Sequence, residues 1–364
     1  MNVLHIYKDY YPVLGGIENH VKVLAEAQAA AEHRVTVLVC GPSPRTQVEN
    51  INGVKVIKAG RLITAASMPL SLSQPSILAR LRPDVAHIHS PYPLGEVANW
   101  LLGQARTTVI THHSDVVRQR GWLRFYGPLL RRVLRAADCV IATSPRYIET
   151  SPWLRPVREK CTVVPLGVDH RRFTPPTNQL TNQPTLLFTG RLRYYKGLDT
   201  LLWALSALSG VCLVIVGDGP MRAEWERLAG TLGLRERVTF TGEVPDDDLP
   251  RYHHTAHVFV LPANARAEAF GTVLLEAMAS GLPCITTEVG TGTSWVVQDG
   301  VTGLVVPPRD PRALAEAIRG LLDDPQRRAA MGQAARARVE AEFTLERMIA
   351  RVQAVYEEAL ERSI

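Results

Sequence analysis

The sequence predicts an α/β protein built from two doubly wound, Rossmann-like domains with parallel sheets. The first observation is the length, because 364 residues exceed what one compact core usually holds. The second is a repeated order of short apolar strand and helix, which is typical of parallel sheets covered on both faces. The third is a stretch rich in Pro, Asn, Gln and Thr, which separates two sets of strands.

We expect four parts along the chain. Residues 1–172 form a first domain, 173–184 a linker, 185–345 a second domain, and 346–364 a final helix that packs back toward the first domain. The two domains are expected to face each other across a cleft. Ligands of open α/β sheets bind beyond the carboxyl ends of the strands, so the chemistry is expected on loops that follow strands.

Short apolar runs mark the expected strands. In the first domain these runs cover residues 35–40, 85–89, 108–111 and 139–143. In the second domain they cover residues 186–190, 211–217, 238–242, 258–261 and 284–287, and the last 45 or so residues read as helices.

The composition excludes several classes of protein. Apolar residues make up 46% of the chain and charged residues 21%, as in a soluble globular protein. No apolar run approaches the ~18 residues of a membrane-spanning helix, and the first residues lack the layout of a signal peptide, so we expect a cytoplasmic protein. The five cysteines are widely spaced without a Cys-x-x-Cys pair, which argues against a disulfide framework and structural zinc.

Positive charge is concentrated in the first half of the chain. The net charge is +6, basic residues outnumber acidic ones over residues 1–170, and the remainder carries a slight acidic excess. The stretch from Arg118 to Arg135 holds six arginines, no acidic residue and several aromatic residues. This pattern favours an anionic membrane surface as partner, with an ordinary amphipathic helix as the alternative. No nucleic-acid-binding module is recognisable, so no nucleic acid is expected.

Two carboxylates lie on either side of Gly271: Glu268 precedes it, and Glu276 lies inside a helix predicted over Thr272–Ala279. Fully helical spacing separates them by about 12 Å, which is too far for an acid–base pair but suits the two ends of a long ligand. The free amides at a helix start attract an anion. We expect a sugar near Glu268, a phosphate at Gly271 and Thr272, and a ribose near Glu276, with two solvated surface glutamates as the alternative.

Other candidate residues also follow predicted strands. In the second domain, Arg191 offers a fork of hydrogen-bond donors and Lys196 a point charge, which together suit a diphosphate. Near the start of the chain, the paired Gly15 and Gly16 let backbone amides approach a ligand. The dinucleotide fingerprint Gly-x-Gly-x-x-Gly is absent there, and the Gly-x-Gly that begins at Gly217 is interpreted as a plain strand-to-helix turn.

Taken together, these motifs resemble the retaining glycosyltransferases of family 4, which have the two-domain GT-B fold. The resemblance covers nearly the whole chain and looks most like bacterial mannosyltransferases of surface-polysaccharide assembly. In chain order, it rests on the motifs at residues 15–16, 83–89, 111–115, 164–169, 190–197, 217–220 and 268–283.

The resemblance implies how a nucleotide sugar would be bound. Arg191 and Lys196 would bind its diphosphate, with Gly15 and Gly16 approaching from the first domain. Glu276 would hold the hydroxyls of the ribose.

The resemblance also implies the groups around the transferred sugar. Glu268 would hold sugar hydroxyls, aided by the backbone amides of Phe270 and Gly271. His113 would lie beside the sugar at the reacting centre, and Asp115 would orient the acceptor.

The implied reaction is hexose transfer to a hydroxyl of a glycan, lipid-linked or small-molecule acceptor, with retention at the anomeric carbon. Arg191 and Lys196 would stabilise the leaving phosphate electrostatically. A covalent intermediate on Glu268 and a front-face attack both stay open, and we favour the latter. The expected nucleotide sugar is GDP-mannose, narrowly ahead of a UDP-sugar. No cofactor or metal is expected, and His87 and His89 are interpreted as structural.

Three other functions fit parts of the same pattern. A nucleotide-sugar epimerase or a phosphorylase could use the same scaffold. A nicotinamide-dependent oxidoreductase is disfavoured by the missing fingerprint, and a two-lobed binding protein by the missing signal peptide.

Overall fold

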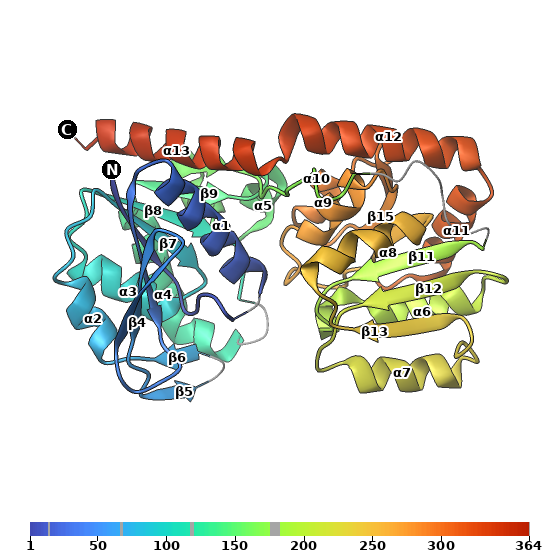
Figure 1. Cartoon of the computed structure of the whole chain (residues 1–364), viewed down its shortest axis with the longest axis horizontal. Helices are drawn as coiled ribbons and strands as arrows, with labels where there is room; N and C mark the ends of the chain where they lie inside the picture. Colours follow the sequence, from blue (N-terminus) through green and yellow to red (C-terminus); the bar gives the residue numbers. More distant parts are fainter. Residues whose placement is uncertain (14, 66–67, 117–119, 175–182, 364) are drawn as a thin grey trace. The chain divides into compact units, whose positions relative to one another are not determined.

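The computed structural model describes residues 1–13, 15–65, 68–116, 120–174 and 183–363. These residues form two α/β units (Figure 1). The first unit comprises Met1–Pro165 together with Met348–Ile364, and the second comprises Leu166–Arg347.

The boundaries of the two units differ from the expected ones. The first unit ends at Pro165 and not at residue 172, because Val168 pairs with Thr344 and Phe173 is buried in the core of the second unit. The second unit likewise extends to Arg347 and not to residue 345. Most of the expected linker, residues 175–182, lies outside the described residues.

In the described part of the first unit, eight strands form one sheet in the spatial order β10-β9-β8-β7-β1-β2-β4-β3. Neighbouring strands are parallel, except that β3 runs antiparallel to β4. The strands are β1 (Asn2–Ile6), β2 (Arg34–Cys40), β3 (Gln47–Ile51), β4 (Val54–Ala59), β7 (Val85–Ser90), β8 (Thr107–His112), β9 (Cys139–Ala142) and β10 (Cys161–Val163), beside a hairpin of β5 (Ile63–Ala65) and β6 (Met68–Leu70).

The helices of the first unit bury apolar stripes against this sheet. In α1, Val21, Leu24 and Ala25 are fully buried at the three-to-four-residue spacing of one helix face. Figure 1 shows α13 beside α1, and Gln28 of α1 donates a hydrogen bond to the Tyr356 hydroxyl of α13. The helices are α1 (Gly16–Ala30), α2 (Ser73–Leu78), α3 (Pro93–Leu102), α4 (Arg120–Ala136), α5 (Pro145–Thr150), the 3-10 helix η1 (Arg155–Lys160) and α13 (Leu345–Glu361).

The described part of the second unit holds a six-stranded, all-parallel sheet in the order β13-β12-β11-β14-β15-β16. The strands are β11 (Thr185–Thr189), β12 (Cys212–Val216), β13 (Val238–Gly242), β14 (Val258–Leu261), β15 (Cys284–Thr287) and β16 (Gly303–Val306). The helical segments are η2 (Tyr194–Lys196), α6 (Leu198–Ser206), α7 (Arg222–Thr231), η3 (Asp246–Asp248), α8 (Leu249–Thr255), α9 (Thr272–Ala279), α10 (Thr293–Val296), α11 (Pro311–Leu322) and α12 (Pro325–Glu342).

Continuous burial of its strands explains why the second sheet is parallel. Every residue of β11, β14 and β15 is buried, as expected for strands covered by helices on both faces. The central order β12-β11-β14 brings three strand-to-helix loops to one edge. There the backbone at Gly217 lies so close to the Gly190 carbonyl that an added Cβ would approach that oxygen to 2.3 Å. The Gly-x-Gly at Gly217 is therefore a tight turn between β12 and α7, which confirms its interpretation.

Gly197 and Gly210 provide a matched test of this close packing. Both have a φ of +68°, but a Cβ on Gly197 would lie 1.9 Å from the Pro262 carbonyl oxygen, whereas one on Gly210 would meet no heavy atom within 4 Å. Left-handed strain alone should make Gly210→Ala cost about 1 kcal/mol of unfolding free energy. The added clash should raise the cost of Gly197→Ala to about 3 kcal/mol or more. Urea unfolding measures both, and equal losses would contradict the account.

Candidate active site

The loop between β11 and α6 carries the predicted cations of the second unit. Arg191 is exposed, and its side chain makes no ion pair with any other described residue. Lys196 lies at the end of η2 and is only 7% exposed. The two side chains therefore differ: the guanidinium faces solvent, whereas the ammonium is held inside the protein.

Lys196 is held by an ion pair with Glu268. Its Nζ lies 2.7 Å from Oε2 of Glu268, and both side chains are about nine-tenths buried. Burial lowers the pKa of Lys196, but the attraction of the Glu268 carboxylate outweighs it and leaves the pKa raised. The sequence pattern predicted both residues but not this contact, which joins the loop after β11 to the loop after β14.

The loop from Glu268 to the start of α9 is fixed by a neighbouring turn. The Thr291 hydroxyl donates to the Glu268 carbonyl at 2.7 Å, and the Gly292 amide donates to the Ala269 carbonyl at 2.7 Å. The ring of Phe270 packs near Trp295. These bonds hold the main chain that leads into the helix.

The start of α9 offers unpaired backbone donors. The helix spans Thr272–Ala279, as predicted, with Gly271 at its N-cap in the left-handed conformation (φ 78°). Within the described residues, the amides of Phe270, Gly271 and Thr272 donate to no acceptor. Such amides at a helix N-terminus attract an anion.

Glu276 lies one turn further along α9. Burial and, to a lesser degree, the nearby Asp246 carboxylate raise its pKa to about 7, although Arg172 and Lys196 oppose the shift. Arg172 was not among the residues predicted for the site. Its guanidinium donates to the Asp246 carbonyl at 2.9 Å, which places a cation on the same side of the second unit.

In the first unit, the paired glycines Gly15 and Gly16 lie at the N-terminus of α1. Gly15 is the N-cap, and a Cβ there would come within 2.1 Å of Oε2 of Glu18. The Glu18 carboxylate is in turn 3.4 Å from Nζ of Lys8. A Cβ on Gly16 would meet no heavy atom within 4 Å. A Cβ on Gly15 would therefore displace the Glu18 carboxylate, whereas the surface above Gly16 is open to a ligand.

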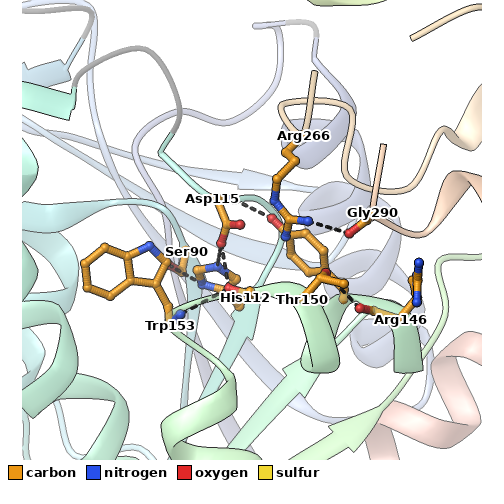
Figure 2. Close-up of polar contacts among 10 residues, drawn as sticks. Ser90, His112, Asp115, Arg146, Thr150, Trp153, Arg266 and Gly290 are labelled. Carbon is orange, nitrogen blue, oxygen red and sulfur yellow. Dashed lines mark hydrogen bonds and ion pairs between the residues drawn. The ribbon is translucent and has the colours of Figure 1, made fainter. Parts of the chain in front are cut away.

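His112 and Asp115 form a network at the end of β8 (Figure 2). The Asp115 carboxylate lies 3.1 Å from Nε2 of His112 and accepts a hydrogen bond of 2.7 Å from the Ser151 hydroxyl. The Asp115 amide lies 2.5 Å from the Tyr147 hydroxyl, and Ser90 contacts the other nitrogen of His112 at 3.3 Å. These contacts hold the loop that follows β8. Figure 2 also shows Arg266 of the second unit, whose guanidinium bonds to the carbonyl of Gly290.

His113 belongs to a different network from its neighbour His112. Its Nε2 lies 3.0 Å from Nδ1 of His89, and the ring of His20 contacts its edge at a centroid distance of 5.0 Å. Both His113 and His89 are buried. The structure therefore separates the two adjacent histidines and gives His113 imidazole neighbours, while His112 contacts a carboxylate.

The histidine neighbours of His113 are the largest group that the sequence analysis overlooked. It named His87 and His89, whose ring centroids are 4.3 Å apart, but not His5 or His20. A signal was present, because a histidine lies within or directly after three apolar strand-like runs of the first domain, at His5, His89 and His112. Among the described residues, two triads have nitrogen atoms within 4.8 Å of one another, a spacing open to a metal ion: His5, His87 and His89, and His20, His89 and His113.

Two family models match the chain, one on each half. The model described as Glycosyltransferase Family 4 matches residues 14–172, and the model described as Glycosyl transferases group 1 matches residues 170–338.

Full-length relatives match nearly the whole chain. The D-rhamnosyltransferase WbpZ of Pseudomonas aeruginosa is 39% identical, over 94% of this chain and 92% of its own length. The O-antigen chain mannosyltransferase C of Escherichia coli is 35% identical over 96% of each chain. A GDP-mannose-dependent alpha-(1-6)-phosphatidylinositol monomannoside mannosyltransferase of Mycobacterium tuberculosis is 30% identical, also over 96% of each.

The fold also matches solved structures. Sucrose-phosphate synthase from Thermosynechococcus elongatus superposes with a TM-score of 0.81 and 26% identity over 99% of each chain. The two parallel-sheet units are therefore the two domains of a GT-B fold, as the sequence predicted.

The buried histidines of the first unit predict sensitivity to acid. Burial lowers the pKa of His5 and His20 to about 4 and places the pKa values of His87, His89 and His113 well below 6.5. The unfolded chain, in which histidine titrates near 6.5, binds more protons than the folded chain below that pH.

The free energy of unfolding of the first unit should therefore fall as the pH drops from about 6.5 toward 4. The expected slope is about 1.4 kcal/mol per pH unit for each neutral buried histidine, and these residues add no slope above a pH of about 7.5. Urea unfolding at several pH values measures this slope. A curve as flat at pH 5.5 as at pH 8 would mean that the cluster is already charged when folded.

Proposed function

The chain belongs to the group 1 and family 4 glycosyltransferases, which act on nucleotide sugars, and from this premise we propose a retaining mannosyltransferase. It would move mannose from GDP-mannose to a hydroxyl of a glycan or lipid-linked acceptor in surface-polysaccharide assembly. The main observation that supports this proposal is the buried ion pair of Lys196 and Glu268 beside the free amides at the start of α9.

These groups match the chemistry of a sugar diphosphate. Lys196 and the exposed Arg191 supply positive charge to the diphosphate, and the amides of Phe270, Gly271 and Thr272 supply aligned donors. The Glu268 carboxylate would accept hydrogen bonds from sugar hydroxyls. Its ion pair makes it a poor nucleophile, which favours front-face attack with retention over a covalent intermediate.

The remaining residues complete the proposed roles. Glu276 would accept hydrogen bonds from the ribose hydroxyls, and the open surface above Gly16 would admit a phosphate or an acceptor. His113 would lie beside the transferred sugar. The role of Asp115 in orienting the acceptor stays a prediction, and its contacts with His112 and Ser151 support an indirect action through the loop after β8.

The relatives support a manno-configured sugar. One is a mannosyltransferase of the O-antigen chain and another is GDP-mannose-dependent, and D-rhamnose, which a third transfers, is 6-deoxy-D-mannose. A UDP-sugar is the alternative. We propose that no metal is needed because Lys196, Arg191 and the α9 amides can stabilise the phosphate, so activity should survive treatment with a chelator.

We further propose that the first unit docks on an anionic membrane through α4. Leu130, Val133 and Leu134 face the core, as in an ordinary amphipathic helix, but Phe125 is 76% exposed beside the exposed Arg124. Arg118 of the predicted stretch lies outside the described residues. Among the described helices, none combines the length and apolar character needed to cross a bilayer. Docking on the inner face of the membrane from the cytoplasm would bring the protein to a lipid-linked acceptor.

A thermal-shift panel of GDP, UDP, dTDP and ADP with their sugars tests the proposed nucleotide site. A nucleotide at ~100 times its dissociation constant should add about 2.7 kcal/mol of stability. GDP and GDP-mannose should stabilise the wild type but not Glu276→Ala. The control is Glu224→Ala, which alters an exposed glutamate of α7 and should be stabilised like the wild type. Stabilisation by UDP alone would mean that the donor is a UDP-sugar and not GDP-mannose. The absence of stabilisation by any nucleotide would contradict the proposed site.

Sedimentation with vesicles that contain anionic lipid tests the docking surface. Binding should be salt-sensitive and should weaken at least tenfold when Arg124, Arg131 and Arg132 are all changed to Ser. The matched control changes three exposed arginines of the second unit, Arg227, Arg312 and Arg327, to Ser and should bind like the wild type. Equal weakening of both triple variants would indicate a net-charge effect and would remove α4 as the docking surface.

A further inference from the structure

Five histidines gather at the carboxyl edge of the first sheet. His5 lies on β1 directly opposite His87 of β7, and His89 lies two residues further along β7. His113 follows β8, and His20 comes from α1. The rings of His5, His87 and His89 have no exposed surface, and His113 is 5% exposed.

Three of these rings form a linear chain of hydrogen bonds that starts at Gln28 of α1. The Gln28 side-chain oxygen lies 2.7 Å from Nε2 of His5. Nδ1 of His5 lies 3.0 Å from Nε2 of His89, and Nδ1 of His89 lies 3.0 Å from Nε2 of His113. Each ring thus contacts its two neighbours through its two different nitrogens. We call His5, His89 and His113 the histidine relay.

The amide oxygen of Gln28 sets the direction of this relay. An amide oxygen only accepts, so Nε2 of His5 must carry a proton. A neutral imidazole has one N–H, and burial holds the pKa of each relay histidine far below neutrality. Nδ1 of His5 therefore accepts from Nε2 of His89, and Nδ1 of His89 accepts from Nε2 of His113. The last nitrogen, Nδ1 of His113, keeps its lone pair and bonds to no other described residue.

A second set of contacts agrees with this orientation of the Gln28 amide. Its NH₂ group donates to the Tyr356 hydroxyl at 3.4 Å. That hydroxyl lies 2.6 Å from Nδ1 of His87, whose Nε2 lies 2.6 Å from the Thr111 hydroxyl. Tyr356 accepts from Gln28 and donates to His87, so all donors and acceptors pair consistently. The C-terminal helix α13 thereby helps to orient a residue of α1.

We propose that Gln28, His5 and His89 are positioning residues that hold His113 in the Nε2-protonated form, with Nδ1 as a hydrogen-bond acceptor. The inference rests on the proposed function, which places His113 beside the transferred sugar. An acceptor at Nδ1 recognises a hydroxyl group, from either the sugar or the acceptor molecule, and repels a phosphate oxygen. His113 then orients a hydroxyl and leaves the phosphate to the cations and amides of the second unit.

A metal ion at the cluster predicts the opposite protonation. An ion between His5 and His89 needs lone pairs on both facing nitrogens, Nδ1 of His5 and Nε2 of His89. His89 would then carry its proton on Nδ1 and donate to Nε2 of His113, which would be protonated on Nδ1. The facing nitrogens are 3.0 Å apart, a hydrogen-bond length, whereas two nitrogens at 2.0–2.1 Å on a tetrahedral ion are about 3.3 Å apart.

Long-range ¹H–¹⁵N NMR of the full chain labelled with ¹⁵N-histidine distinguishes these states. Signals of His113, His89 and His5 are assigned by single substitution. In the wild type at pH 7.5, all three should show a protonated Nε2 and an unprotonated Nδ1. A protonated Nδ1 on His113, or stoichiometric Zn²⁺ binding that shifts the His5 and His89 signals, would overturn the relay.

Substitution of Gln28 tests the origin of the relay. Gln28→Met removes the accepting oxygen at similar volume, so His113 should become a mixture of both tautomers. Gln28→Glu keeps an accepting oxygen and should retain the wild-type tautomer. Turnover of GDP-mannose should fall at least tenfold in kcat for Gln28→Met, with little change in KM, and should recover in Gln28→Glu. Wild-type tautomers in Gln28→Met would overturn the proposal.

The proposed function can fail separately from the relay. His113→Asn should lower the turnover of GDP-mannose at least as far as Gln28→Met. Unchanged turnover in His113→Asn, together with the predicted wild-type tautomers, would overturn the role of His113 in catalysis and leave the assignment of its protons standing. The wild-type spectrum needs no variant to fold, so the tautomers are measured in either case.

Discussion

Parallel strands that end along one edge are the constraint on which the rest of this structure depends. Each group assigned a role lies at or just beyond the carboxyl end of a strand, or on the helix that follows. In the second unit, β11 and β14 are neighbours, so the loop of Lys196 meets the loop of Glu268. In the first unit, β1, β7 and β8 are neighbours, so His5, His89 and His113 meet in the same way. Within each unit, distant sequence segments meet because the strands that precede them are neighbours.

The two units bury different kinds of polar group, a charged pair in the second unit and neutral imidazoles in the first. The second unit buries a cation, which is costly unless a partner is present, and Glu268 supplies that partner for Lys196. The first unit buries four imidazoles, those of His5, His87, His89 and His113, and burial keeps them neutral while hydrogen bonds satisfy their nitrogens. A sugar nucleotide presents both kinds of surface, since its diphosphate is anionic and its sugar carries neutral hydroxyls.

The sequence predicted the local features of this site better than its long-range contacts. The helix beginning at Thr272, the strand that precedes Glu268 and the tight turn at Gly217 all follow from local apolar runs and glycine positions. The ion pair of Lys196 and the histidine relay depend on which strands are neighbours and in what register, and a single sequence does not contain that information. The boundary of the first unit differs from the expected one for the same reason, because Val168 pairs with Thr344 near the C-terminus. Gln28 and Tyr356 gave no local signal at all, since each resembles an ordinary helix residue.

The most direct measurement of the central claim is a crystal structure of the protein with GDP-mannose. The account predicts the diphosphate at the amides of Phe270, Gly271 and Thr272, within reach of Arg191 and Lys196. It also predicts the ribose hydroxyls at Glu276 and the mannose hydroxyls at Glu268. A nucleotide bound elsewhere, or a diphosphate that leaves the Lys196 loop and the start of α9 untouched, would contradict it.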